Sequence, residues 1–379
     1  MKKTTLLLLA TVTATLVLAI VLLSNRQEIE LSQPTPQVFP KLLDAINTVA
    51  TIHIATQAGT ITVIRDGNHW NVKEKFGYAA DRGKVREALL GLADLRLYEP
   101  KTKNPELYER LDLLDVEAEG STSTFVQLKT AEETSLAELI IGKQHVAKGN
   151  PRQDEIYIRK PQDPQAWLAL GKLQIIQSAD KWLDTAITNI DEKRIHRVRI
   201  LHADGTSLTI EKDTPSATDF KVLHLPEGAT IAAPFNVNNI ASTLADLSFD
   251  DIHPASENIV STTVQNTAIL ETFDGLQVTI KTTAQDGQHY LRGSAAYKPE
   301  LRQEIELEQK ESDKKENESA KTETAEMNQP PKVPPKSPEE VEEEASVLMN
   351  KLQNWVFVIP RFKVENFSKH LDDLLEKIP

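Results

Sequence analysis

The stretch "WLALGKLQIIQSADKWLD", from Trp167 to Asp184, has a divergent second copy near the end of the chain, "WVFVIPRFKVENFSKHLD", from Trp355 to Asp372. Further matches follow in the same order: Gly59 with Gly205, Trp70-Asn71-Val72 with Phe220-Lys221-Val222, and "LADL" at 92–95 with "LADL" at 244–247. A single amphipathic pattern is generic, whereas several matches in one order indicate an internal repeat. We therefore read the chain as a tandem duplication.

Both copies are rich in strand and turn signals. In "LQVTIKT", from Leu276 to Thr282, apolar and polar residues alternate with the period of a half-buried strand. Asp-Gly pairs predict hairpins, because type I′ turns need positive φ and glycine adopts it cheaply; the pairs are Asp66-Gly67, Asp204-Gly205, Asp274-Gly275 and Asp286-Gly287. Reading outward from such turns predicts three-stranded meanders at about residues 50–73, 122–159, 197–223 and 263–295.

Two stretches have the apolar spacing of a helix that lies across a meander, "DRGKVREALLGLADL" at 81–95 and "NVNNIASTLADL" at 236–247. Asp81 and Asn236 are the expected N-caps. The second helix of each copy is expected in the closing stretch. The sequence thus predicts an α+β fold, in which an N-terminal transmembrane helix precedes two tandem βββ-α-βββ-α repeats with antiparallel sheets covered by helices.

The cellular location is encoded at the N-terminus. Residues 4–24 carry no charge and are mostly apolar, and a helix of that length spans about 30 Å, the thickness of a bilayer core. A cleaved secretory signal is the alternative, but its apolar region is usually shorter, and Leu22 stands where a small residue is needed. Lys2 and Lys3 place the N-terminus in the cytoplasm. We expect a single-pass protein of the inner (cytoplasmic) membrane with its C-terminal domain in the periplasm.

Composition and repeat boundaries give the predicted domains: a cytoplasmic tip at 1–3, a transmembrane anchor at 4–24, a spacer at 25–46, repeat 1 at 47–190, repeat 2 at 191–298 with 346–379, and an insertion at 299–345. The insertion mixes Glu and Lys around a Pro-rich centre. It holds too little apolar surface to offset chain entropy, so we predict that it is disordered, with helix allowed at its edges. Two roles are open, a docking arm for a partner and a tolerated surface loop.

Charge and composition exclude several functions. The net charge of −13 argues against a nucleic-acid partner, because phosphate binding needs a basic surface. The absence of cysteine excludes disulfides, thiolate nucleophiles and thiolate metal sites. The chain also lacks the P-loop, nucleophile-elbow and His-Glu-x-x-His motifs. We therefore expect no catalytic residue and no cofactor.

Three residues form the best remaining cluster for a metal ion, Asp250, Asp251 and His253. Repeat 1 has "RLYEP" at this place, and acidic residues after a helix are common, so we expect no metal there. His196 and His202 are too far apart along a strand, roughly 20 Å, to share one. The tryptophans are expected to pack in the core; they are Trp70, Trp167, Trp182 and Trp355.

Together, the stretches "ITVIRDGNHWNV", "YAADRGKVREALLGLADL", "PELYERLDL" and "SADKWLD" resemble an uncharacterised bacterial family, a domain of unknown function. Its members are single-span, membrane-anchored periplasmic repeat proteins associated with ABC-transporter and gliding-motility-like gene clusters. The resemblance implies an accessory envelope protein with no assigned catalytic residues. Repeat 2 departs from the family pattern at "IAAPFNVNNIASTLADL" and in the acidic insertion.

Function can be framed as alternatives from different classes. The leading hypothesis is a non-catalytic interaction protein, anchored in the inner membrane through residues 4–24, that serves a membrane-protein complex such as an ABC-type transporter. The alternative is an envelope hydrolase or carbohydrate-binding protein, which two carboxylates about 5–10 Å apart in a deep cleft would favour. A stalk that spaces envelope layers is the third.

Overall fold

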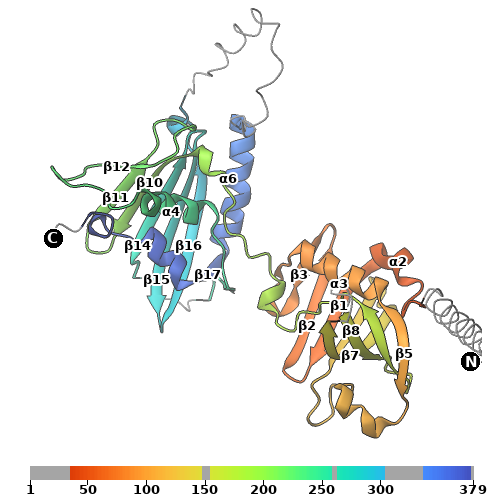
Figure 1. Cartoon of the computed structure of the whole chain (residues 1–379). Helices are drawn as coiled ribbons and strands as arrows, with labels where there is room; N and C mark the ends of the chain where they lie inside the picture. The colour runs from red at the N-terminus through yellow and green to blue at the C-terminus, as the bar shows by residue number, and fades with distance from the viewer. Residues whose placement is uncertain (1–34, 147–153, 258–262, 304–335, 377–379) are drawn as a thin grey trace, which may run out of the picture. The chain divides into compact units, whose positions relative to one another are not determined.

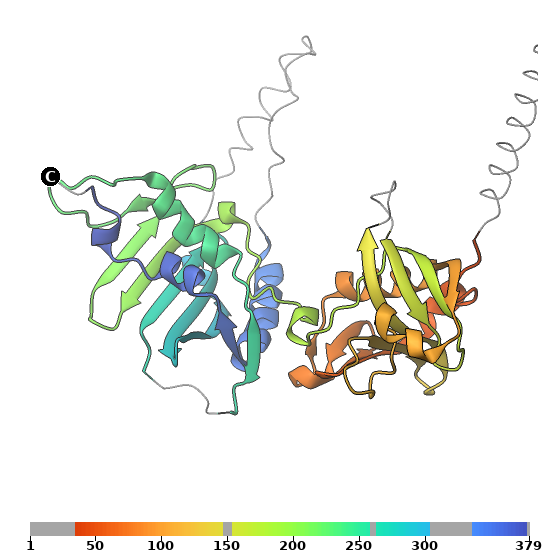
Figure 2. The same ribbon diagram turned by 60° about the horizontal axis from the view of Figure 1, so that its bottom comes forward.

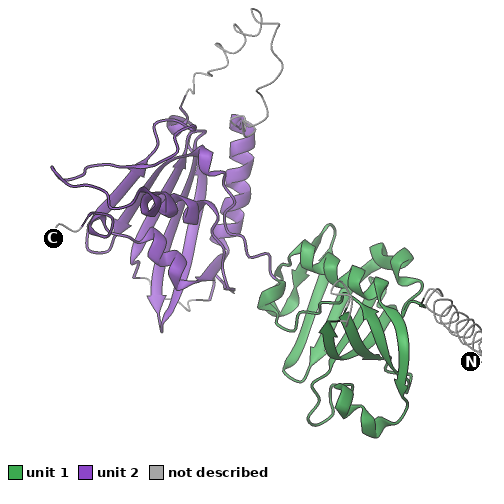
Figure 3. Cartoon of the chain, in the orientation of Figure 1, with its two compact units in different colours: residues 1–182 green, residues 183–379 purple. Residues whose placement is uncertain are grey.

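The computed structural model describes residues 35–146, 154–257, 263–303 and 336–376. These residues form two compact units that divide between Trp182 and Leu183 (Figure 3). Each unit is built around one antiparallel sheet, of nine strands in the first unit and eight in the second (Figures 1 and 2).

The sheet of the first unit runs in the order β4-β3-β2-β1-β6-β7-β8-β9-β5. Its strands are β1 (Val49–Thr56), β2 (Gly59–Asp66), β3 (His69–Val72), β4 (Tyr78–Ala79), β5 (Arg96–Thr102), β6 (Thr124–Thr130), β7 (Ser135–Val146), β8 (Asp154–Arg159) and β9 (Ala166–Gly171). The α-helices are α2 (Leu42–Ala45) and α3 (Arg82–Asp94), and the segment between β5 and β6 contains the 3₁₀ turns η3 (Pro105–Leu107) and η4 (Glu109–Leu111).

The sheet of the second unit runs in the order β12-β11-β10-β14-β15-β16-β17-β13. Its strands are β10 (Ile195–His202), β11 (Ser207–Glu211), β12 (Lys221–Val222), β13 (Asp251–Pro254), β14 (Asn266–Thr272), β15 (Leu276–Gln285), β16 (Gln288–Tyr297) and β17 (Trp355–Ile359). The helices are α4 (Pro234–Ala245), α6 (Pro338–Gln353) and α7 (Arg361–Phe367), and the 3₁₀ turn η6 (Glu192–Arg194) precedes β10.

The two sheets share one strand order once β4 is set aside, since β3-β2-β1-β6-β7-β8-β9-β5 matches the second sheet strand for strand. The pairing register also shifts at the same place, between Val49 and Thr51 in β1 and between Ile195 and Arg197 in β10. Counting from this irregularity along β1 and β10, Ala55 corresponds to Leu201, so the cross-strand rows that start at these two residues are equivalent.

The core of the second unit lies on one face of its sheet. Alternate side chains point to opposite faces of a strand, and those on the inner face are buried, including Val198, Leu270, Val278 and Ile280. Helix α6 packs on this face, because a Cβ added to Gly293 would come within 3.0 Å of Leu352 Cδ2. The side chains on the outer face are partly or fully exposed, with few exceptions.

The sheet of the first unit is covered on both faces at one end. One face carries buried residues such as Ile54 and Val126. On the other, Ile140 and Ala166 join Tyr108 and Leu113 from the segment between β5 and β6 in a second apolar cluster. This segment therefore covers a part of the outer face.

The predicted fold class is wrong. In place of βββ-α-βββ-α, the first unit has four strands before α3 and five after it, and its described residues beyond β9 include no α-helix. The second unit inserts α6 before its last strand β17 and ends with α7. Few helices accompany the two large sheets. The closing stretches begin as strands β9 and β17, because a short apolar run fits a buried strand as well as a helix.

The predicted transmembrane helix has no support in the described residues, where no helix is long and apolar enough to cross a bilayer. The segment on which it was predicted, residues 4–24, lies outside the described residues. Much of the predicted insertion, residues 304–335, also lies outside them. Helix α6 begins at Pro338, at the C-terminal edge of the insertion where the prediction allowed a helix, and its start has a capping box between Ser337 and Glu340.

Of the caps and turns predicted from local sequence, two are confirmed and one is wrong. Asp81 caps α3 as predicted, since its side chain accepts hydrogen bonds from the backbone N–H groups of Gly83 and Lys84. The prediction for Asn236 is wrong, because α4 begins with Pro234 at its first position, which proline favours. The Asp286-Gly287 turn has φ of 51° and 78°, as a type I′ hairpin requires.

Candidate functional site

The residues considered for a metal do not converge. Asp251 and His253 lie on the edge strand β13, opposite Val358 and Val356 of β17, and Asp250 precedes the strand. Asp251 Oδ1 accepts a hydrogen bond of 2.8 Å from the backbone N–H of Ile252. Within the described ranges, no group of three or more His, Asp or Glu residues could hold a metal ion.

The two histidines considered together lie in separate environments. His196 Nδ1 is 2.8 Å from the carbonyl oxygen of Lys212. His202 stacks on His370, with ring centroids 3.8 Å apart. Of the four tryptophans, Trp182 is fully buried, and its indole N–H donates to the carbonyl of Ile176. The other three are half-buried.

Arg159 holds the segment between β5 and β6, which contains "PELYERLDL", on the first sheet. Arg159, 5% exposed on β8, donates from Nη2 to Asp115 Oδ1 at 2.5 Å and to the carbonyl of Leu113 at 3.2 Å. Its guanidinium also lies 4.6 Å from the centre of the Tyr108 ring. This arginine thus fixes a cover over the outer face of the first sheet.

In the second unit, a buried ion-pair cluster joins η6, the turn between β14 and β15, and α6. Arg194 donates to both carboxylate oxygens of Asp274, at 2.7 and 3.2 Å, and to both of Glu344, at 2.9 and 2.8 Å. Lys336 Nζ lies 3.0 Å from Glu344. Both carboxylates have their charge matched, so the cluster acts as a clasp that holds α6 against the sheet.

Burial and ion pairing act in opposite directions on the pKa values of this cluster. Burial alone would lower the pKa of Arg194, but its hydrogen bonds with Glu344 and Asp274 outweigh burial and raise it. Burial alone would raise the pKa of Glu344, and the hydrogen bonds from Arg194 lower it below its usual value. The charged forms of Arg194 and Glu344 are therefore favoured, which suits a structural ion pair better than a site of proton transfer.

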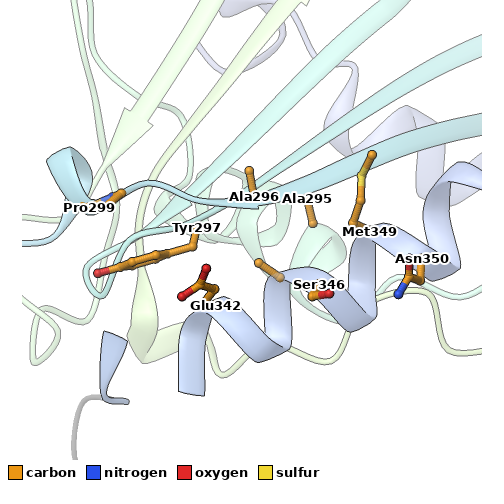
Figure 4. A pocket seen from close by; sticks show the side chains of 9 residues that line it. Ala295, Ala296, Tyr297, Pro299, Glu342, Ser346, Met349 and Asn350 are labelled. Carbon is orange, nitrogen blue, oxygen red and sulfur yellow. The ribbon is translucent and has the colours of Figure 1, made fainter. Parts of the chain in front are cut away.

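A groove of about 410 Å³ lies between the end of β16 and α6 (Figure 4). Tyr297 and Glu342 flank one end of it and Met349 and Asn350 the other, with small side chains between them. Glu342 is the single carboxylate among its lining residues. A glycosidase needs a pair of carboxylates, so this groove does not supply the arrangement that would favour a hydrolase.

The most distinctive surface is the outer face of the second sheet, which we call the open face. It carries mostly polar and charged side chains from five strands, β11, β10, β14, β15 and β16: Arg197, Arg199, Leu201, Thr209, Glu211, Thr267, Ile269, Glu271, Gln277, Thr279, Lys281, Arg292 and Ser294. All except Glu271 are partly or fully exposed. The face is therefore a largely exposed surface of polar and charged side chains.

One cross-strand row shows how the two sheets differ. In the first sheet the row is Ala55, Phe125, Ile140 and Arg159, and in the second it is Leu201, Thr267, Lys281 and Arg292. Phe125 and Ile140 of the first row pack with Tyr108 and Leu113, and the guanidinium of Arg159 lies over the Tyr108 ring. In the second, Lys281 and Arg292 are exposed, and none of the described residues forms an ion pair with either.

Lys281 and Arg292, which we call the cationic pair, stand directly opposite each other on β15 and β16. Like charges in this position repel, which destabilises a sheet. The row of Arg197, two rows away on the same face, has alternating signs: Arg197 Nη2 lies 2.9 Å from Glu211, and Arg197 Nη1 lies 3.7 Å from Glu271. The cationic pair therefore departs from the pairing of opposite charges that the same face shows two rows away.

Sequence reasoning placed Lys281 on the outer side of its strand but missed its pairing with Arg292. The signal was present in the Asp286-Gly287 turn, because a two-residue hairpin fixes the register of the strands that it joins. Counting outward from Gln285 opposite Gln288 brings the two cations together.

A family model described as a domain of unknown function (DUF4340) matches residues 70–265. The match begins within β3 of the first unit and ends just before β14 of the second. No curated protein and no solved structure matches the chain.

Proposed function

The chain belongs to the DUF4340 family, and we propose that it is a membrane-anchored accessory protein of the cell envelope that binds a membrane-protein complex without catalysing a reaction. The open face of the second unit is the surface through which it binds. An ABC-type transporter is the partner that the family resemblance suggests.

Anchoring and location are supported by the N-terminal sequence. Residues 4–24 are uncharged and apolar, and Lys2 and Lys3 precede them. In this proposal the segment remains in the inner membrane and both units lie in the periplasm. Alkaline phosphatase fused to the C-terminus tests this orientation, because it is active only when exported; an inactive fusion would contradict the proposed location.

The open face is the observation that carries the proposed function. The second unit buries its core on the opposite face, and the open face is left largely exposed. Charged residues placed across from one another against electrostatic preference point to a binding role rather than a structural one. The equivalent row of the first sheet is closed by a segment of its own unit.

Site-specific photo-crosslinking in intact cells tests the proposal. The crosslinking amino acid is placed at Thr279 or Ser294 on the open face and, as a control, at Tyr98 on the edge strand β5. We expect a membrane-protein adduct from the open face that is absent or weaker from Tyr98. Recovery of the bare chain from all three positions would refute the proposed function.

A further inference from the structure

We infer that the cationic pair, Lys281 with Arg292, binds an acidic segment of the partner protein. This inference rests on the proposed function and specifies the chemistry of its partner. A carboxylate placed between the two cations would remove the repulsion between them and gain charge-assisted hydrogen bonds.

The first unit contains a template for this contact. Arg159 and Arg292 occupy the same position in equivalent rows. Arg159 has its charge matched by Asp115, and the carbonyl of Leu113 accepts a further hydrogen bond. Both come from the segment that crosses the outer face of the first sheet. We infer that the partner supplies to Arg292 what the first unit supplies to Arg159 from its own chain.

The surroundings of the cationic pair favour a polypeptide over an anionic membrane. Thr267 and Ser294 offer hydroxyl groups beside the pair, which suit the amides and side chains of a peptide. Glu211 and Glu271 lie on the same face and pair with Arg197, so the face has mixed charge and is not the uniformly basic surface that anionic headgroups attract. The face is an exposed sheet surface and not an enclosed pocket, which suits an extended segment better than a small anion.

The spacing of cations sets an expectation for the acidic segment. Arg199 lies on β10, two strands from Lys281 and two residues along, so their Cα atoms are roughly 12 Å apart. An extended chain advances about 3.3 Å per residue. Carboxylates separated by three to four residues would therefore reach both the pair and Arg199.

The test uses the full chain in zwitterionic lipid nanodiscs and fluorescein-labelled deca-glutamate as the probe. We expect binding that weakens as salt rises, because the contact is between exposed charges. The double variant Lys281→Glu/Arg292→Glu is expected to weaken binding at least tenfold. Lys281→Arg should bind like the original chain. The control variant Arg86→Glu/Lys103→Glu makes the same charge change on exposed residues of the first unit and should leave binding unchanged.

Folding is controlled within the same series. Lys281→Glu alone places opposite charges across the strands, so its unfolding midpoint should be unchanged or raised while binding falls. An equal loss of probe binding in the control variant, or no loss of probe binding in Lys281→Glu/Arg292→Glu, would overturn the inference. Displacement of the probe by phosphatidylglycerol vesicles would assign the face to lipid, and a changed oligomeric state in the reversed variant would assign it to a second copy; either result overturns it.

The inference and the proposed function fail in different ways. Crosslinking from the open face captures a partner if the proposed function is right. If the yield of that adduct is unchanged in Lys281→Glu/Arg292→Glu, the inference is wrong and the proposed function stands. If no partner is captured from any position, the proposed function is wrong.

Discussion

Replacing Arg194 with Met tests whether the ion-pair clasp holds the second unit together. The substitution removes four hydrogen bonds to Asp274 and Glu344 from a guanidinium that is about 10% exposed. Glu344 keeps Lys336 at 3.0 Å. Asp274, 2% exposed, keeps a hydrogen bond from Thr272 but loses its charge partner.

Most of the expected loss of unfolding free energy therefore comes from the buried Asp274 carboxylate, which is left without a charge partner. Removing one partner of a buried ion pair costs about 3–5 kcal/mol. Arg302, which donates to the backbone carbonyl of Asp274 at 3.4 Å, leaves some positive charge nearby. We therefore expect a loss at the lower end, about 3 kcal/mol. With a slope of about 3 kcal/mol per molar urea, the midpoint falls by about 1 M.

Pulsed hydrogen exchange with mass spectrometry across a urea series measures this in the full chain. Peptides from β14 and β15 report on the second unit, and peptides from β6 and β7 serve as an internal control. Arg194→Met should lower the midpoint for the first set alone. Adding Asp274→Asn should recover part of the loss, because the unmatched charge is then gone. An equal shift in both sets, or no recovery in the double variant, would refute the reasoning.

Further predictions concern single sites in each unit. Gly142→Ala should destabilise the first unit by about 1–3 kcal/mol, measured by the same exchange series, because its Cβ would lie 2.1 Å from the carbonyl oxygen of Leu111. Asp81→Ala should cost about 1 kcal/mol in the first unit alone, since two hydrogen bonds at the start of α3 are lost. The folded pKa of Glu344 lies below its ordinary value of 4.5, so its stabilisation is present above that pH and is lost as the pH falls through the folded pKa. The urea midpoint of the second unit should therefore drop in acid, and Glu344→Gln should make the drop shallower.

Local chemistry explains which features the sequence could predict. The Asp286-Gly287 hairpin and the Asp81 cap depend on residues a few positions apart, so their patterns are readable without tertiary contacts. The closing stretches at Trp167 and Trp355 were misread, because their apolar runs are short and β8 and β16 decide their conformation by pairing.

Long-range register explains what the sequence did not reveal. The edge strand β5 contains few alternating apolar residues and is a strand because β9 pairs with it. The cationic pair depends on a register between two strands, and the cover of the first row depends on a segment that no local pattern assigns to that face. The surface that we propose to be functional therefore arises from pairing between elements rather than from a motif.

Two equivalent arginines with different surroundings allow structure and function to be separated. Arg159 is 5% exposed, donates to Asp115 and Leu113 and lies over the ring of Tyr108. Arg159→Met should therefore destabilise the first unit by about 2–4 kcal/mol. Arg292 is exposed in the same row position, and Arg292→Met should change the stability of the second unit by no more than about 0.5 kcal/mol.

Binding of deca-glutamate should respond in the opposite way. Arg292→Met removes half of the cationic pair and should weaken binding, whereas Arg159→Met leaves the open face of the second unit unaltered. Exchange midpoints and probe affinity measured on the same two variants decide the matter. If Arg292→Met destabilises the second unit as much as Arg159→Met destabilises the first, Arg292 serves stability. The proposal that the open face is a binding surface would then be wrong.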